Sequence, residues 1–365
     1  MQSLELYAWL RLLLTPGVGR NNARRLLAAF GSAEAVWQQS AATLRAVTSP
    51  RIEQALANVP VDLDGIHTKL QNWLNESNNR YVITLGDEAY PSDLLQTEDP
   101  PLLLYVWGQQ AALKHQQRLA IVGSRNPTPQ GALNAHQFAK TLGQAGVCVV
   151  SGLALGVDAA AHEGALEAGA PTLAVVGTGL DRVYPSRHRD LAERVVVNGA
   201  LISEYPLGTP PLAAHFPQRN RIIAGISLGT LVVEAALQSG SLITARLAAE
   251  QGREVFAIPG SIHSPQAKGC HALIRQGAKL VESAQDILEE LHLRDPLPRP
   301  ESATAQTNTK NNLLDLIGFD PVSLDALQAR CGLDTATLQA RLLELELNGD
   351  IGRLPGGLLQ CTRQS

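Results

Sequence analysis

Four short segments in the middle of the chain combine glycine with hydroxyl side chains, and each leads toward a helical pattern. Glycine lets the backbone come close to a ligand, while hydroxyl groups and free amides at a helix N-terminus donate hydrogen bonds to an anion. One such segment is common in any turn from strand to helix, but four together favour an extended phosphate-binding edge. The segments are Gly123-Ser124-Arg125, Ser151–Asp158, Gly177–Asp181 and Ser239-Gly240-Ser241.

Basic residues lie in or near these segments, although the stretch 80–290 holds 16 Lys/Arg against 19 Asp/Glu. A guanidinium fork bonds two phosphate oxygens at once. An alternative is that Arg219 and Arg221, which flank Asn220 in an expected loop, pair with acids such as Glu204 and Glu234. The basic candidates are Arg125, Arg182, Arg187, Arg189, Arg219, Arg221 and Lys268.

Aromatic residues make up only 4% of the chain, so those near the candidate segments are few. Phe216 precedes the Arg219–Arg221 segment, and Tyr184 and Tyr205 follow other expected strands. A base of a single strand could stack on one of these rings. The alternative for Phe216 is packing in the core.

The segments above require a sheet that places them along one edge. Short β-branched runs, apolar on both faces, predict the strands of a buried parallel sheet. Helical patterns between them, such as 130–145 and 242–251, predict a doubly wound α/β fold with ligands at the carboxyl ends of the strands. The runs are Leu119–Val122, Val147–Val150, Thr172–Val176, Leu201–Ser203, Leu231–Val233 and Glu254–Ile258.

Patterns divide the 365 residues into domains. Residues 1–79 read as helical, 80–293 as the α/β domain, and 294–311 as a flexible linker rich in Pro, Ser, Thr and Asn. Residues 312–365 predict three helices and a turn at Leu354–Leu358. That last module carries 4 Lys/Arg against 7 Asp/Glu, so it should repel phosphate and contact protein or its own chain.

Other function classes find little support in the sequence. It lacks a GxGxxG fingerprint in the first strand-to-helix turn, a P-loop, a GxSxG elbow and a metal-ligand cluster, which predicts no enzyme, cofactor or metal. His162 and Glu163 could form a catalytic pair, but a packed or solvated His162 behind an N-capping Asp158 is the simpler interpretation. Four cysteines without CxxC spacing and no membrane-spanning or signal segment indicate a cytoplasmic protein.

The segments, in their order along the chain, resemble the DNA-processing protein A (DprA/Smf) family. The matching stretches include AIVGSRNPTPQG, SGLALGVDAAAHEGAL, HFPQRNRIIAGIS and LVVEAALQSGSLITARLAAEQGREVFAIPG. The resemblance implies an extended Rossmann-like domain, flanked by a sterile-alpha-motif-like or helix–hairpin–helix domain and a winged-helix module. It also implies a homodimer that binds and protects incoming single-stranded DNA and loads RecA on it during natural transformation.

By position, the resemblance assigns the phosphate contacts to three places. Ser124 and Arg125 look like the first contacting pair, Arg219–Arg221 like the second basic element, and Ser239–Ser241 with Lys268 like the edge of the pocket. Relatives often have Lys directly after Tyr184-Pro185, where this chain has Ser186, so Arg187 would have to substitute.

The N-terminal helices and two other functions leave alternatives open. The turn Pro16–Gly19, with Arg20, Arg24 and Arg25 nearby, could face a phosphate or only pack on the main domain. A nucleotide phosphoribohydrolase would also use Gly-Thr and a nearby Glu, here Gly229-Thr230 and Glu234 in a displaced arrangement. A nucleotide-sensing scaffold without DNA contact is the third possibility.

Overall fold

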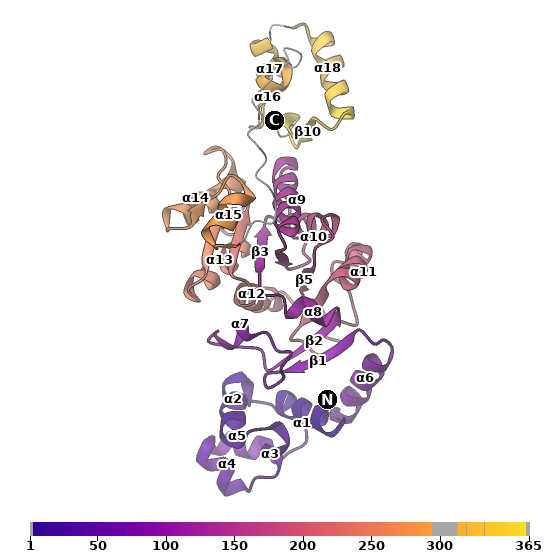
Figure 1. The fold of residues 1–365 in the computed structure, drawn as a ribbon, viewed down its shortest axis with the longest axis vertical. Coiled ribbons are helices and arrows are strands. Elements are labelled where there is room, and N and C mark those ends of the chain that lie inside the picture. Colours follow the sequence, from indigo (N-terminus) through magenta and orange to yellow (C-terminus); the bar gives the residue numbers. More distant parts are fainter. Residues whose placement is uncertain (1–2, 294–311, 319, 332, 363–365) are drawn as a thin grey trace. The chain divides into compact units, whose positions relative to one another are not determined.

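The computed structural model describes the chain except residues 1–2, 294–311, 319, 332 and 363–365 (Figure 1). The expected linker, 294–311, therefore lies outside the described residues. Two compact units result: unit 1 holds residues 1–116 and 172–227, and unit 2 holds residues 117–171 and 228–365. Each unit is thus built from two separate stretches of the chain.

The first part of unit 1 is helical, as the sequence predicted. Ser32, Ser40 and Ser49 begin three of its short helices, because each hydroxyl accepts a hydrogen bond from a backbone N–H in the first turn. Leu6, Leu10 and other apolar residues are buried between the helices. The helices are α1 (Ser3–Leu14), α2 (Gly19–Phe30), α3 (Ala33–Trp37), α4 (Ala41–Val47), α5 (Pro50–Leu56) and α6 (Leu63–Asn75).

Four strands of unit 1 lie in the order β1 (Arg80–Thr84), β2 (Leu103–Gly108), β6 (Ala200–Ser203) and β5 (Thr172–Val175). The pairs β1–β2 and β2–β6 are antiparallel, and β5–β6 is parallel. The sequence analysis did not predict β1 and β2. The helices around these strands are α7 (Ser92–Leu95), α8 (Gln110–Leu113), η1 (Ser186–His188), α11 (Arg189–Asn198) and α12 (His215–Gly225).

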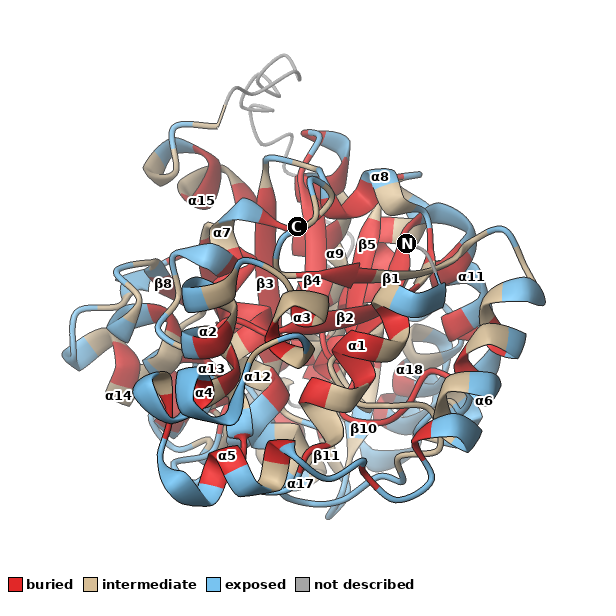
Figure 2. Cartoon of the chain, turned by 90° about the horizontal axis from the view of Figure 1, so that it is seen from below, coloured by how far each residue is buried: buried red, intermediate tan, exposed pale blue. Residues whose placement is uncertain are grey.

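Five strands of unit 2 lie side by side and are all parallel. Their order is β4 (Cys148–Ser151), β3 (Arg118–Gly123), β7 (Gly229–Val233), β8 (Glu254–Ala257) and β9 (Lys279–Leu280). Figure 2 shows β3 and β4 almost wholly buried, as expected for strands covered on both faces. The helices are α9 (Pro129–Gln144), α10 (Val157–Glu167), α13 (Gly240–Glu250), η2 (Pro265–Ala267), α14 (Lys268–Arg275) and α15 (Ala284–Glu290).

The predicted α/β class with mostly parallel strands is confirmed. All six predicted runs form strands, with ends displaced by at most two residues. Aliphatic side chains from β3, β7 and the helices α9 and α10 pack into one core. Among the described residues, no helix is long and apolar enough to cross a bilayer.

The C-terminal module forms the predicted three helices and wing (Figure 1, yellow). The helices are α16 (Asn312–Ile317), α17 (Leu324–Cys331) and α18 (Thr335–Leu347). Strands β10 (Ile351–Leu354) and β11 (Leu358–Cys361) pair antiparallel around the turn that the sequence placed there. The module has its own core, which includes Leu327 and Leu338.

Candidate nucleic-acid interface

The predicted basic residues of unit 2 lie at the carboxyl ends of parallel strands. Arg125 follows β3 after one residue, and Lys268 opens α14 in the segment after β8. The register of β3, β7 and β8 directs their carboxyl ends to the same edge. Both basic residues are exposed. We call Arg125, Ser239–Ser241 and Lys268 the strand-end edge.

Two helices start at the strand-end edge with hydroxyl caps. Thr128 begins α9, and its hydroxyl accepts the N–H of Gly131 at 3.0 Å. Ser239 begins α13, and its hydroxyl accepts the N–H of Ser241 at 3.3 Å. Strand β7 ends at Val233, several residues before Ser239. Ser239 therefore belongs to the start of α13 and not to the end of the strand. The remaining amides of the first turns of α9 and α13 favour a negative charge there.

Glycine at position 123 serves packing rather than ligand approach. A Cβ built there would lie 1.9 Å from the carbonyl oxygen of Val233 and 2.8 Å from Cγ2 of Val157. Ser124 holds the next turn, because its hydroxyl accepts the N–H of Asn126 and its carbonyl accepts the N–H of Val157, both at 3.1 Å. Close packing between β3, β7 and α10 therefore fixes where Arg125 leaves the sheet.

The substitution Gly123→Ala should lower the free energy of unfolding by about 1–3 kcal/mol, because the added methyl group overpacks the core. Gly240→Ala is the matched control, since a Cβ at Gly240 meets open space and alanine favours a helical position. Urea denaturation followed by circular dichroism measures both. Equal stability of the two variants would show that the sheet accommodates the methyl group at Gly123.

Asp158 orders the loop after β4. Its Oδ2 accepts the N–H groups of Gly152 and Ala154 at 3.1 and 3.2 Å. The expected N-cap role of Asp158 was wrong, because α10 begins at Val157 and Gly156 occupies the cap with φ 77°. His162 is completely buried, in agreement with the packed alternative.

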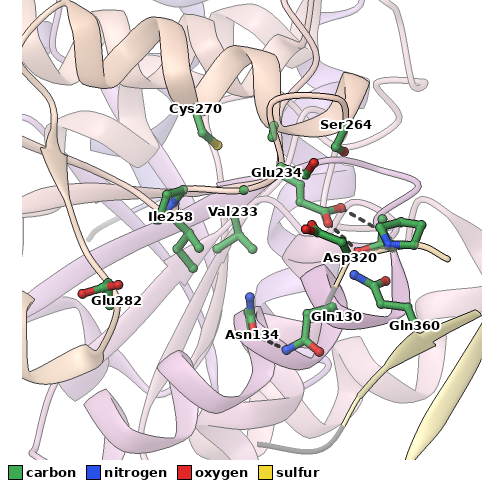
Figure 3. Close-up of a pocket in the computed structure, with 16 residues that line it drawn as sticks. Gln130, Asn134, Val233, Glu234, Ile258, Ser264, Cys270, Glu282, Asp320 and Gln360 are labelled. Carbon is green, nitrogen blue, oxygen red and sulfur yellow. Dashed lines mark hydrogen bonds between the residues drawn. The ribbon is translucent and has the colours of Figure 1, made fainter. Parts of the chain in front are cut away.

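A pocket of about 890 Å³ lies beside the strand-end edge within unit 2 (Figure 3). Its charged lining residues are all acidic: Glu234, Glu282 and Asp320. Figure 3 shows Glu234, Asp320 and Gln360 near one another, with Glu282 on the opposite side. Neither Arg125 nor Lys268 lines it. This acidic pocket should repel phosphate, so a nucleic-acid backbone would follow the two basic residues outside it.

Glu234 is part of the scaffold at this place. Its carboxylate accepts the N–H of Thr128 at 2.8 Å and the Thr128 hydroxyl at 2.5 Å. Its φ of 51° lies in the left-handed region, which a non-glycine residue adopts only when its surroundings stabilise it. Glu234 therefore joins the loop after β7 to the start of α9.

In unit 1, the Arg219–Arg221 segment is helical, and the expectation of a loop there was wrong. The segment belongs to α12, whose first turn accommodates Pro217 because an N–H is not needed there. Arg219 is 4% exposed and donates to the carbonyl oxygen of Val175. Asn220, between the two arginines, is half-buried. Arg219 thus holds α12 against the end of β5.

Arg221 belongs to a network of charges within unit 1. Its guanidinium pairs with Glu204 and lies 3.4 Å from Asp99. Asp99 also accepts Arg20 at 2.7 Å and Arg24 at 2.6 Å. The pairing with Glu204 that the sequence left open is therefore present for Arg221. Arg20 and Arg24 are likewise engaged by an acid of their own unit.

Burial and charge act against each other in this network. Burial tends to raise the pKa of Asp99, but the hydrogen bond from Arg24 and the charges of Arg221 and Arg20 hold it below its ordinary value. Burial raises the pKa of Glu204 above its ordinary value despite the lowering effect of Arg221 and Arg20. Arg221 therefore stabilises a carboxylate that has little access to water.

Aromatic rings gather at the N-terminal end of α12. The rings of Phe216 and Tyr184 lie 5.6 Å apart at 42°, and Tyr205 stacks on His215 at 4.0 Å. Tyr184 is 47% exposed and Phe216 is half-buried, so neither is sealed in the core. Arg187 is exposed on η1, and no ion pair engages it within the described residues. These rings and Arg187 could contact a base and its phosphate.

The predicted site residues thus form two sets. Unit 2 holds Gly123, Ser124, Arg125, Ser239, Gly240, Ser241 and Lys268. Unit 1 holds Arg187, Phe216, Arg219, Asn220 and Arg221. The sequence analysis missed the roles of Thr128 as a cap and of Asp99 as the centre of the charge network. A Thr before Pro129 is a recognisable cap signal, whereas Asp99 had none.

Comparisons with known proteins agree with this architecture. Residues 81–292 match the family model described as DNA recombination-mediator protein A, and residues 297–357 match the DprA winged helix domain. Protein Smf of Escherichia coli K12 is 45% identical over 300 residues, which are 80% of each chain.

Solved structures of DNA processing protein A are similar to this chain. The X-ray structure of DNA processing protein A from Streptococcus pneumoniae has a TM-score of 0.68 and 36% identity, covering 80% of this chain and 98% of the other. A structure of DNA processing protein A from Helicobacter pylori, described for its single-stranded DNA binding mode, has a TM-score of 0.53 and 31% identity over 58% of this chain and 95% of the other. With mostly parallel strands, a winged helix and matches over most of its length, this chain belongs to the DNA recombination-mediator protein A family, which includes the DprA and Smf proteins.

Proposed function

We propose that this chain binds single-stranded DNA without strong sequence preference, protects incoming DNA and loads RecA on it during natural transformation. The observation that carries the proposal is the strand-end edge, where exposed Arg125 and Lys268 stand beside two helix N-termini. Family membership and the DNA-binding relative from Helicobacter pylori support it. In this role the chain is a binding protein rather than an enzyme.

Titration with fluorescent oligo-dT at two salt concentrations tests the proposal. Phosphate contacts release counterions, so the affinity should fall steeply with salt. An oligo-dC of the same length should bind with similar affinity. An absent or salt-independent signal would overturn the proposal and favour a scaffold without DNA contact.

The phosphoribohydrolase alternative gains nothing from the structure. The carboxylate of Glu234, which that activity would use, is bonded to Thr128. Incubation with nucleoside monophosphates should release no free base. Release of free base in proportion to protein concentration would favour the phosphoribohydrolase over the DNA-binding protein.

RecA loading and a homodimer are further parts of the proposal, and the family resemblance supports both. Light scattering on the purified chain should give twice the monomer mass of 39.0 kDa. RecA should form filaments faster on strands covered by a single-strand-binding protein when this chain is added. A monomer mass would contradict the homodimer. An unchanged rate of filament formation would contradict RecA loading.

Removing residues 312–365 should change the oligo-dT affinity by less than about threefold. The module is acidic, and its described contribution to the acidic pocket comes from Asp320, Pro321 and Gln360. Because the module carries the same negative sign as phosphate, it should add nothing to DNA binding. Fluorescence anisotropy on the shortened chain measures this, and a tenfold loss, worth about 1.4 kcal/mol, would show that the winged helix contacts DNA.

A further inference from the structure

A second pocket of about 600 Å³ lies within unit 1, and two of the basic candidates from the sequence, Arg182 and Arg189, line it. Its walls come from α6, the strands β1 and β2, the loops after β5 and β6, and α11. We call it the tryptophan pocket. Its lining residues are Lys69, Asn72, Trp73, Glu76, Arg80, Trp107, Leu180, Asp181, Arg182, Val183, Arg189, Glu193 and Leu207.

Two tryptophans and an arginine form one wall of the tryptophan pocket. The guanidinium carbon of Arg80 lies 5.2 Å from the ring centre of Trp73 and 5.3 Å from that of Trp107. Arg80 also donates to the carbonyl oxygen of Trp73 at 3.0 Å, which fixes its plane. Trp73 is 5% exposed, but Trp107 is only half-buried. The Trp107 ring and the Arg80 plane therefore offer a base an ordered surface for stacking.

Two of the three acids in the tryptophan pocket already have cationic partners. Glu76 pairs with Arg80. Asp181 accepts Lys69 at 2.8 Å and the N–H of Gly208 at 2.7 Å. In each pair the charges of the acid and of its cation cancel. The other cations of the pocket are therefore available to a ligand.

The other cations of the tryptophan pocket are Arg182 and Arg189. Both are exposed, and within the described part of the chain no ion pair engages either side chain. Glu193 lies four residues after Arg189 on α11, and within the described chain the two side chains form no ion pair. The excess positive charge thus lies on the loop after β5 and at the start of α11, beside the aromatic wall.

We propose that the tryptophan pocket binds one nucleoside 5′-phosphate unit. The base stacks against Trp107 and the Arg80 plane, and the phosphate is held by Arg182 and Arg189. The unit can be a free nucleotide or one residue of a DNA strand, and these two sources share the same recognition chemistry. For a strand, this site adds to the proposed function; for a free nucleotide, it is independent of that function.

The full-length chain titrated with thymidine 5′-monophosphate and separately with dT20 tests the proposal. The pair Arg182→Ala with Arg189→Ala should lower the affinity for at least one of these ligands about tenfold. Arg194→Ala, on the same helix but outside the pocket lining, should change neither by more than twofold. Glu193→Gln should tighten binding, because it removes the remaining unpaired carboxylate.

The responses of the two ligands separate the sources. A loss with both ligands, or with the mononucleotide alone, assigns free nucleotide to the pocket, and a loss confined to dT20 assigns it to a strand. Trp107→Phe keeps an aromatic face and should retain most binding, whereas Trp107→Leu should not. Unaltered affinity for both ligands in the double-arginine variant overturns the proposal.

Changes at the strand-end edge keep this test distinct from the proposed function. The pair Arg125→Ala with Lys268→Ala should not alter the binding of the mononucleotide to the tryptophan pocket. If wild-type protein fails to bind dT20 but binds the mononucleotide, the proposed function fails and the pocket stands. If the strand-end variant loses dT20 affinity while the double-arginine variant binds both ligands as the wild type does, the pocket fails and the proposed function stands.

Discussion

Replacing Arg125 and Lys268 together with alanine should weaken the binding of oligo-dT about 100-fold or more at low salt. A hydrogen bond to a charged group contributes about 1.5–3 kcal/mol, and each 1.4 kcal/mol is a tenfold change in affinity. The slope of log affinity against log salt should become shallower by about 1.4, because two phosphate contacts on a single strand are lost.

The position of these residues in the sheet explains why we expect them to act together. Strand β7 lies between β3, which precedes Arg125, and β8, which precedes Lys268. Two strand spacings separate the ends of β3 and β8 by about 10 Å. A strand crossing this edge would meet both cations and the capped start of α13 at Ser239.

Fluorescence anisotropy with dT20 at two salt concentrations is the measurement. Arg275→Ala is the matched control, because Arg275 is exposed at the other end of the helix that Lys268 opens, about 10 Å along its axis. It should change affinity less than twofold. An unaltered affinity in the double variant, with its thermal unfolding also unaltered, would exclude the strand-end edge as the phosphate site.

The parallel strands could be predicted because their chemistry is local. A strand covered on both faces needs a continuous apolar run, and runs such as Leu119–Val122 and Leu231–Val233 satisfy that requirement directly. Strand β1, Arg80–Thr84, instead shows a mixed pattern with its first three residues half-buried. Strand β1 forms by pairing with β2, and the residue pattern of the sequence does not show that these two segments lie side by side.

The charges of the candidate site show a similar limit. The sequence identifies Arg125 and Arg221 as equally basic, but in the structure Arg125 is exposed, whereas Arg221 is largely buried beside Glu204 and Asp99. One of those neighbours, Asp99, lies more than a hundred residues earlier in the chain. Such pairing depends on tertiary structure, so residue type and spacing do not show which arginines are held by buried acids.

Arg221→Ala should lower the free energy of unfolding by about 3–5 kcal/mol, the usual cost of removing one partner of a buried ion pair. The Glu204 side chain is 7% exposed and the Arg221 side chain 13% exposed, so water cannot easily replace the lost guanidinium. Arg20, at 3.5 Å from Glu204, offers a weaker substitute and could reduce the loss toward the lower figure.

Urea denaturation at neutral pH, followed by circular dichroism, measures this loss. Arg45→Ala is the control, because the Arg45 side chain is 62% exposed in its ion pair with Glu53. An exposed pair of that kind contributes less than about 1 kcal/mol. The double change Arg221→Met with Glu204→Gln should recover much of the lost stability, because no unpaired buried carboxylate remains.

The same variants separate a structural role of Arg221 from direct DNA binding. If Arg221 acts through the network, the double change restores stability and oligo-dT affinity together, because α12 again holds Phe216 in place. If Arg221 itself contacts phosphate, the double change restores stability but leaves the affinity low. If Arg221→Ala lowers the oligo-dT affinity without lowering stability, the network role is contradicted. If Arg221→Ala lowers both affinity and stability and the double change restores both, Arg221 is a positioning residue.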